Sequence, residues 1–202
     1  PYNMDRLLDE ACLLVDWYLA AKLGDARAAE LRPAFVAIWR ELLTSMPWLP
    51  SVVVLRDFHA DNLMWLKNRE GIKRVGLLDF QDAVIGSPAY DLVSFLEDAR
   101  RDVSPETTQI VINHYLQQLA WDKDAFKAVY AVLGAQRNSK IVGIFTRLAK
   151  RDGKFHYLPL LDRVWGHLHT DLQHPMLKPF AEWLDQVLPK EQRTAPMFEQ
   201  KQ

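Results

Sequence analysis

The spacing of apolar residues changes twice along this 202-residue chain, from a helical period to a strand-like pattern and back again. Residues 4–23 and 25–45 repeat apolar side chains every three or four positions, as one face of a helix does. Three short runs of β-branched and large apolar residues follow, at residues 51–55, 63–66 and 74–79. Polar turns separate these runs, which predicts short strands. The helical period then returns, so the sequence predicts an α+β fold, predominantly α, with helices around a small set of short β-strands.

Prolines and capping residues mark where the later helices begin. Ser87-Pro88 and Ser104-Pro105 each place a capping hydroxyl directly before a proline, which is typical of a helix start. Further helices are expected over residues 124–150, 157–172 and 175–188. Gly134 or Gly143 can interrupt the first of these, because glycine weakens a helix interior. We therefore expect the second half of the chain to be helical almost to its end.

The balance of charge argues against two classes of partner. The chain has 25 basic and 26 acidic residues spread along its length, and a formal net charge of -1. No field of one sign therefore draws it to nucleic acid or to an anionic membrane surface. We expect a small-molecule ligand instead, and the sequence does not indicate an oligomeric state.

Two further features bear on the expected location. Cys12 is the single cysteine and can form no disulfide within the chain, which favours a reducing, cytoplasmic setting. No apolar run approaches the roughly 18–20 residues that a membrane-spanning helix needs. We therefore expect a cytoplasmic protein without a membrane partner.

Polar residues with a definite spacing lie in the loops beside the expected strands. Asp57 is followed five residues later by Asn62, and Asp79 ends the third apolar run. A tight turn after Asp57 can bring the Asn62 amide oxygen near the same metal ion as Asp79. Phosphoryl transfer from Mg-ATP needs these groups, since one carboxylate faces the attacking hydroxyl while an amide and a second carboxylate hold metal. The spacing therefore indicates a phosphotransferase.

The same loops allow other interpretations. Each of the three residues above can simply form or cap a turn at a strand end. His59, Asp61, Asp79 and Asp82 can also be taken as ligands of a hydrolytic metal site. Asp61 and Asp82 can contact acceptor hydroxyls or remain solvated. The residue types alone leave these alternatives open.

A family resemblance narrows the choice. The pattern Asp57-x-His59-x-x-Asn62, followed by Asp79, resembles the catalytic loop and metal-binding aspartate of the protein-kinase-like superfamily, in its aminoglycoside phosphotransferase branch. Residues 79–103 and 137–153 resemble the bacterial cell-wall amino-sugar kinases of that branch, the anomeric N-acetylmuramate/N-acetylglucosamine kinases. The similarity covers about residues 50–188.

The resemblance implies a role for each site residue and a pair of cofactors. Asp57 would be the catalytic residue, Asn62 and Asp79 would hold Mg²⁺, and ATP would donate the phosphoryl group. Asp91 would hydrogen-bond the backbone of the catalytic loop, although a charge favourable to the helix dipole is an alternative. Candidate substrate-binding residues are His59, Asp61, Asp82, Asp98 and Arg100.

Two of the candidate substrate-binding residues can also be explained by a purely structural role. Asp98 and Arg100, with Arg101, close a helix, and cations are favourable at a helix C-terminus in any case. A contact from this cluster to a sugar hydroxyl or carboxylate is the functional alternative. The resemblance implies that His59 packs within the loop and does not take part directly in the chemistry.

The resemblance also implies that this chain is part of a kinase. Residues 1–188 look like the C-terminal lobe alone, followed by a polar tail over residues 189–202 that we expect to be loosely held. No glycine-rich loop and no strand lysine precede the catalytic loop, so the groups that grip ATP are expected from an N-terminal lobe that this chain lacks. That lobe would be its partner. Leu55 stands where this branch often has histidine, which weakens the match to antibiotic-modifying members and is compatible with the sugar kinases.

Charge in the site region bears on the acceptor. Residues 55–102 contain nine acidic and seven basic residues, and at least two of the acids are committed to metal or catalysis. The remaining balance suits a neutral or weakly anionic sugar better than a polycationic aminoglycoside. We therefore expect transfer of the γ-phosphate to a hydroxyl of an amino sugar in cell-wall recycling. The alternatives are an aminoglycoside or other small-molecule kinase, and a catalytically dead kinase-like binding module.

Overall fold

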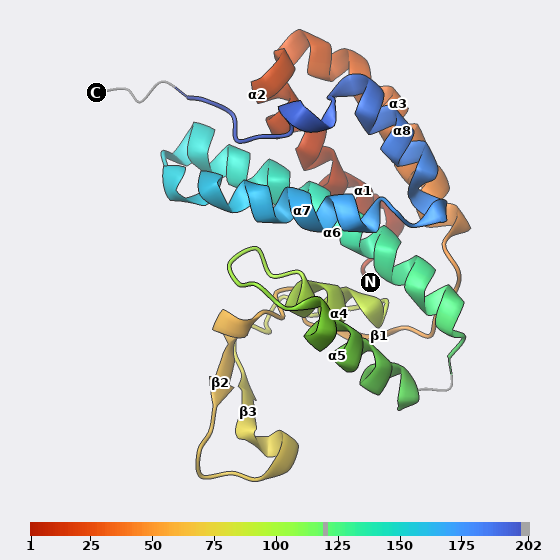
Figure 1. The fold of residues 1–202 in the computed structure, drawn as a ribbon, viewed down its shortest axis with the longest axis vertical. Coiled ribbons are helices and arrows are strands. Elements are labelled where there is room, and N and C mark those ends of the chain that lie inside the picture. The colour runs from red at the N-terminus through yellow and green to blue at the C-terminus, as the bar shows by residue number, and fades with distance from the viewer. Residues whose placement is uncertain (119–120, 199–202) are drawn as a thin grey trace. The chain divides into compact units, whose positions relative to one another are not determined.

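The computed structural model describes residues 1–118 and 121–198, which are mostly helical with a few short strands (Figure 1). The predominantly α prediction is thereby confirmed. Internal contacts divide the chain into two compact units. We call residues 1–2 and 47–130 the strand unit, and residues 3–46 and 131–202 the helical unit.

The strand unit contains two antiparallel pairs of strands. Strand β1 (Val52–Val54) pairs with β4 (Val84–Gly86), and β2 (Leu63–Trp65) pairs with β3 (Val75–Leu77). The three expected strands are confirmed. Strand β4 was not predicted, because it ends at Gly86 directly before Ser87-Pro88, and these residues indicate a turn and a helix start.

Two helices of the strand unit follow the strands. Helix α4 (Ala89–Leu96) begins after Pro88, and α5 (Pro105–Gln117) begins after Ser104, whose hydroxyl accepts a hydrogen bond from the Thr107 amide. Both helices begin within two residues of the predicted Ser-Pro helix starts. Figure 1 shows the β2–β3 hairpin projecting away from α4 and α5, with the 3-10 turn Gly71–Arg74 at its tip.

The helical unit opens with a helix whose hydrogen-bond pattern changes along its length. Helix α1 (Met4–Leu13) continues through a π-helical segment (Leu14–Leu19) into α2 (Ala20–Leu23), where a single helix was expected. Helix α6 (Lys123–Asp152) approaches this helix closely, since a Cβ built on Gly143 would lie 2.2 Å from the Leu13 carbonyl oxygen. The π-helical segment therefore begins where two backbones are nearly in contact.

The predicted helices of the helical unit are present with modified ends. Helix α3 spans Asp25–Ser45 as expected, α7 spans Leu161–Asp171 and α8 spans Lys178–Val187. Helix α6 has no break at either glycine. Gly134 and Gly143 instead permit close packing, since a Cβ on Gly134 would meet the Asp171 carboxylate at 2.6 Å.

Aromatic side chains fill the centre of the helical unit. The rings of Phe35, Trp39 and Phe180, from α3 and α8, have centroids 5.0–6.1 Å apart and are fully buried. Such pairs contribute beyond their buried area when tilted or edge-on. Within the described ranges, no helix has the combination of length and apolar character needed to cross a membrane.

The expectation of a loosely held tail is wrong for the described part, up to residue 198. Arg193 is 6% exposed, and its guanidinium donates to the Leu188 carbonyl oxygen at 3.0 Å and pairs with Asp185. The Thr194 carbonyl oxygen accepts a hydrogen bond from the buried Tyr18 hydroxyl at 2.9 Å. Tyr18 is distant in the sequence, and Asp185 and Leu188 lie in α8 and at its end, so the polar composition of the tail did not reveal these partners. Residues 199–202 of the predicted tail lie outside the described residues.

Candidate active site

The first site residue follows a tight turn with an unusual backbone. The Asp57 amide donates to the Leu55 carbonyl oxygen at 2.9 Å, which closes a three-residue turn of the γ type. Arg56, at its centre, has φ of 71°, in the left-handed region that non-glycine residues rarely occupy. This turn ends β1 and leaves Asp57 exposed at the start of the loop.

Two side chains of helix α4 form hydrogen bonds with the backbone of this turn. The Asp91 carboxylate accepts the Leu55 amide at 2.7 Å and the Arg56 amide at 2.9 Å, one on each oxygen. The Ser94 hydroxyl, one helical turn further on, donates to the Arg56 carbonyl oxygen at 3.2 Å. The predicted bond between Asp91 and the catalytic-loop backbone is therefore present. Ser94 was missed, although its spacing of three from Asp91 places both on one helix face.

Asn62 is fixed by the loop that it ends. Its amide nitrogen donates to the Asp57 carbonyl oxygen at 2.9 Å, which commits the NH₂ group and leaves the amide oxygen as the atom that can ligate a cation. The Nε2 atom of His59 lies 3.4 Å from the same nitrogen. His59 thus packs within the loop, beside the Asn62 side chain.

The β2–β3 pairing brings Asp79 to the same place. The Leu78 amide donates to the Asn62 carbonyl oxygen at 2.9 Å, so that Asp79 follows directly beside the end of the loop. Asp79 has φ of 56°, also in the left-handed region, and its carboxylate accepts a hydrogen bond from the Gln81 side chain. Gln81 was not among the predicted site residues. Asn62 is therefore hydrogen-bonded both to Asp57 and to Leu78, the residue before Asp79.

Two arginines from the turn after α4 reach the catalytic loop. Arg101 donates to the Asp61 carboxylate at 2.8 Å, and the Arg100 Nε lies 3.9 Å from the same carboxylate. The hydrogen bond from Arg101 lowers the pKa of the exposed Asp61 carboxyl below its ordinary value. Asp98 is 2% exposed and accepts the Arg100 amide at 2.9 Å. The structure thus brings Asp61, Asp98 and Arg100 together, with Arg101 in the closest contact.

Asp82 is not brought into this group by any described contact. It occupies an exposed turn closed by a hydrogen bond from the Ala83 amide to the Phe80 carbonyl oxygen at 3.1 Å. Across residues 1–118 and 121–198, no three His, Cys, Asp or Glu side chains are grouped as a metal site. The donor set of Asn62 and Asp79 suits Mg²⁺, which takes one or two protein oxygen ligands together with substrate phosphates.

Comparisons with known proteins found similar sequences. A model of the phosphotransferase enzyme family matches residues 1–129. An N-acetylmuramate/N-acetylglucosamine kinase from Caulobacter vibrioides is 43% identical over 158 residues, which cover 78% of this chain and 44% of that protein. A protein of the same name from Neisseria meningitidis is 34% identical over 179 residues, 83% of this chain and 51% of that protein.

A third similar protein, from Pseudomonas aeruginosa and again named N-acetylmuramate/N-acetylglucosamine kinase, is 32% identical over 195 residues. That match covers 91% of this chain and 55% of that protein. The chain therefore spans about half the length of the curated relatives it matches.

Proposed function

The chain belongs to the phosphotransferase enzyme family, and from that premise we propose that it is the catalytic-loop part, or C-terminal lobe, of an ATP-dependent small-molecule kinase. The transferred group is the γ-phosphate of ATP, and the acceptor is a hydroxyl of an amino sugar. The names of three relatives support this acceptor class. The whole kinase needs residues beyond this chain.

The observation that carries the proposal is the linkage of Asp57, Asn62 and Asp79. The Asn62 side chain is bonded to the Asp57 backbone, and the Asn62 backbone is bonded to the residue before Asp79. Phosphoryl transfer requires positioned groups more than covalent chemistry, so this fixed arrangement suits the reaction. Turn formation alone would not need all three residues at one end of a hairpin.

Each residue then has a defined task. The Asp57 carboxylate, exposed at the start of the loop, orients the acceptor hydroxyl and accepts its proton as the oxygen attacks. Asn62 and Asp79 would hold Mg²⁺ through their side-chain oxygens. Mg²⁺, when bound, neutralises charge on the phosphate oxygens. His59 supports the loop, and Asp61, Asp82, Asp98 and Arg100 are proposed to face the acceptor.

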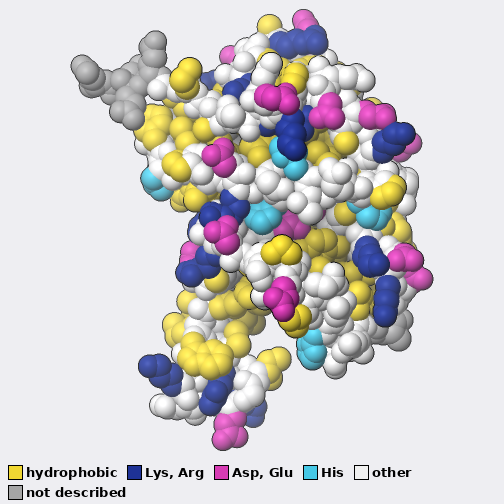
Figure 2. Space-filling view, viewed as in Figure 1, with side chains coloured by type: hydrophobic (Ala, Val, Ile, Leu, Met, Phe, Trp, Pro, Cys, Tyr) yellow, Lys and Arg dark blue, Asp and Glu magenta, His cyan; other side chains and the backbone are white. Residues whose placement is uncertain are grey.

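We also propose that an N-terminal lobe supplies the groups that grip ATP. The strand unit exposes many large apolar side chains, and Figure 2 shows a hydrophobic patch over the β2–β3 hairpin. Trp65 is 62% exposed, Val53 62% and Ile85 51%. The Tyr2 amide donates to the Ile85 carbonyl oxygen at 2.7 Å, so residues upstream of Pro1 would emerge beside the β1–β4 pair, where Val53 and Ile85 are exposed. Exposed apolar patches such as the one over the hairpin are typical of interfaces.

The use of ATP as donor also makes the cytoplasm the proposed setting. Cys12, the single cysteine, is buried and free, in keeping with a reducing compartment.

The central experiment replaces Asp57 in the full-length protein that carries this chain. We expect Asp57→Asn to lower kcat for phosphorylation of N-acetylglucosamine by about 10²–10⁴-fold, because the general base is lost, with Mg-ATP affinity retained. Asp124→Asn is the matched control, because Asp124 is exposed on α6 and forms a surface ion pair with Lys127 at 3.4 Å. Unchanged turnover in the Asp57→Asn enzyme would exclude the role given to this residue.

The acceptor is tested with a panel of compounds in the same assay. N-acetylmuramate and N-acetylglucosamine should be phosphorylated in preference to kanamycin-like polycations, because the charge of residues 55–102 is close to balanced. Preference for an aminoglycoside would retain the kinase and replace its substrate class. Binding of Mg-ATP without transfer to any acceptor would favour the binding-module alternative.

A further inference from the structure

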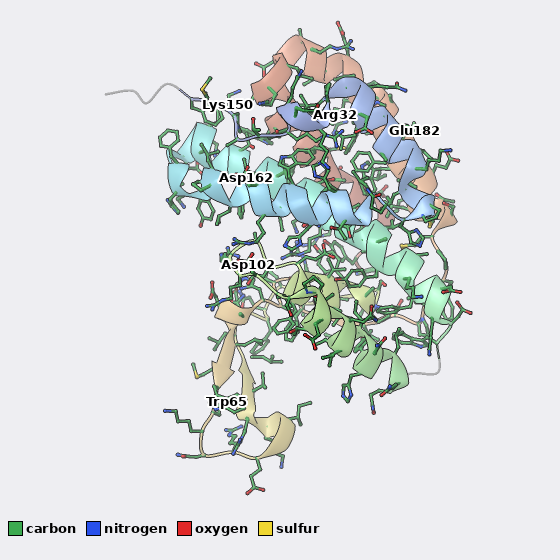
Figure 3. The ribbon with its side chains drawn as sticks, viewed as in Figure 1. Arg32, Trp65, Asp102, Lys150, Asp162 and Glu182 are labelled. Atoms are coloured by element: carbon green, nitrogen blue, oxygen red, sulfur yellow. The ribbon has the colours of Figure 1, made fainter. Side chains whose placement is uncertain are left out.

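The turn after α4 carries a compact set of four charges beside the catalytic loop. Asp61, Asp98, Arg100 and Arg101 contact one another and sum to no net charge. Figure 3 labels Asp102, the residue that follows the two arginines. All four groups belong to the strand unit, and Asp61 directly precedes the proposed metal ligand Asn62.

The two arginines of this set differ in how firmly they are held. Arg100 is anchored to buried Asp98, with its backbone amide 2.9 Å and its Nη1 3.8 Å from the same carboxylate oxygen. Arg101 makes its side-chain ion pair with Asp61 at 2.8 Å, and 59% of its side chain is exposed. The side chain of Asp61 is also 45% exposed. Arg101 is therefore the more exposed of the two arginines, and its side-chain ion pair is with Asp61, whereas the Arg100 side chain also pairs with buried Asp98.

An exposed ion pair of this kind is easily exchanged. Its Coulomb energy is small in water and is screened by salt, so separating Asp61 from Arg101 changes stability little. The guanidinium of Arg101 can bind another carboxylate through two parallel hydrogen bonds, which an ammonium group cannot do. The pair thus offers a cation that can be either neutralised by the protein or used by a ligand.

The two sugars in the names of the relatives differ in charge. N-acetylmuramate carries a carboxylate, and N-acetylglucosamine is neutral. A permanently unpaired cation would favour the first strongly and leave a desolvated charge against the second. A single site that accepts both sugars needs a cation that can change partner.

We propose that Arg101 is the specificity-determining residue that binds the carboxylate of an acidic acceptor in exchange for Asp61. With a neutral acceptor, Asp61 keeps its ion pair with Arg101 and the site remains neutral. This inference rests on the proposed kinase function, and it names the class of acceptor group that Arg101 recognises.

The test compares the two sugars in the full-length enzyme. We expect Arg101→Gln to lower the ratio of kcat/KM for N-acetylmuramate to kcat/KM for N-acetylglucosamine by at least tenfold, mainly through a higher KM for the acid. Arg101→Lys should recover part of this ratio, because it restores the charge without the bidentate geometry. Asp61→Asn should raise the ratio, because it removes the carboxylate that competes for Arg101.

Arg69→Gln serves as the control, since Arg69 lies in the exposed tip of the β2–β3 hairpin and the change removes the same charge. The ratio should be unchanged in this variant. An equal loss for both sugars in Arg101→Gln, or an unchanged ratio, would overturn the inference while leaving the kinase in place. Absence of transfer to either sugar by the unmodified enzyme would instead overturn the proposed function, and this inference with it.

Discussion

Arg56 and Asp79 are the two non-glycine residues of the described chain with positive φ, and each lies at the proposed site. Conformations of this kind cost roughly 1–3 kcal/mol and persist where the surroundings impose them. Around Arg56 the surroundings are three hydrogen bonds from α4, two to the Asp91 carboxylate and one from Ser94. We infer that Asp91 is a positioning residue, which sets the direction of Asp57 without contacting substrate.

This role predicts a graded effect of two substitutions. Asp91→Asn keeps one oxygen acceptor and loses the other, and Asp91→Ala loses both bonds to the turn. We expect kcat to fall by about tenfold or more in Asp91→Ala and by less in Asp91→Asn, because a small displacement of the catalytic group is costly. KM for ATP should change little. Steady-state kinetics measured well below each variant's melting temperature tests this.

A purely structural role for Asp91 would produce a different pattern. The melting temperature would fall, yet kcat of the remaining folded enzyme would equal that of the unmodified protein. Ser94→Ala is the internal comparison, because it removes the single bond to the Arg56 carbonyl oxygen and should give the mildest loss.

His169 predicts a pH dependence of stability in the helical unit. Burial, followed by the nearby positive charge of Arg193, lowers the pKa of His169 from its ordinary value near 6.5. The unfolded chain therefore binds a proton more readily than the folded one, and stability is lost as pH falls below about 6.5 towards the lower folded pKa. We expect His169→Gln to flatten the dependence of the urea midpoint between pH 7.5 and 5.

His114→Gln, on the exposed surface of α5, is the control for that experiment. It should leave the pH dependence as it is in the unmodified chain. If the His169→Gln curve ran parallel to that of the unmodified chain, another group would have to carry the acid sensitivity.

At the level of elements, helices were predictable where their pattern is local. The apolar stripe and both ends of the helix over residues 25–45 are determined by residues close in the sequence, and the helix is present as α3 with those bounds. The π-helical segment Leu14–Leu19 was not predictable, because it accompanies a contact with Gly143 more than a hundred residues away. The docked tail around Arg193 was missed for the same reason.

The close contact at Gly143 yields a stability prediction. Gly143→Ala places a Cβ 2.2 Å from the backbone oxygen of Leu13, which cannot move without shifting the helix. We expect a loss of about 1–3 kcal/mol in the free energy of unfolding, measured in urea. Gly166→Ala is the matched control, because this helical glycine has nothing within 4 Å of its Cβ position.

The control variant should have the opposite sign. Alanine restricts the unfolded chain and favours the helix, so Gly166→Ala is expected to stabilise by about 0.5–1 kcal/mol. Equal effects of the two substitutions would show that helix propensity dominates and that α6 can move away from Leu13.

For the whole molecule, the residues proposed to carry out the chemistry could be named from the sequence, whereas the contacts around them could not. Asp57, Asn62 and Asp79 were proposed because their spacing lies within two neighbouring loops, and in the structure Asn62 is hydrogen-bonded to Asp57 and to the residue before Asp79. The pairing of Asp61 with Arg101 spans forty residues and depends on how α4 is placed, so no local pattern indicates it. The sequence named Arg100, whereas the shorter contact belongs to Arg101.

The exposed apolar surface of the strand unit is where we propose that an N-terminal lobe binds. Cross-strand partners lie on one face of a sheet, so Trp65 and Val75 share a face of the β2–β3 hairpin, and they are 62% and 40% exposed. Figure 3 labels Trp65 on this hairpin. If an N-terminal lobe covers this face, the same side chains are exposed in the isolated chain and buried in the full-length protein.

This predicts a difference between two backgrounds for one double substitution. In the isolated chain, Trp65→Thr with Val75→Lys should change the urea midpoint little, because exposed side chains contribute little burial. In the full-length protein the same change should destabilise by about 2 kcal/mol or more, because it places a charge in an apolar interface. The contact of Arg74 with the Trp65 ring, at 5.5 Å, is lost in both backgrounds and cancels. Ile110→Thr, an exposed position on α5, should have equal effects in both, and equal effects of the double substitution would show that the hairpin face stays open.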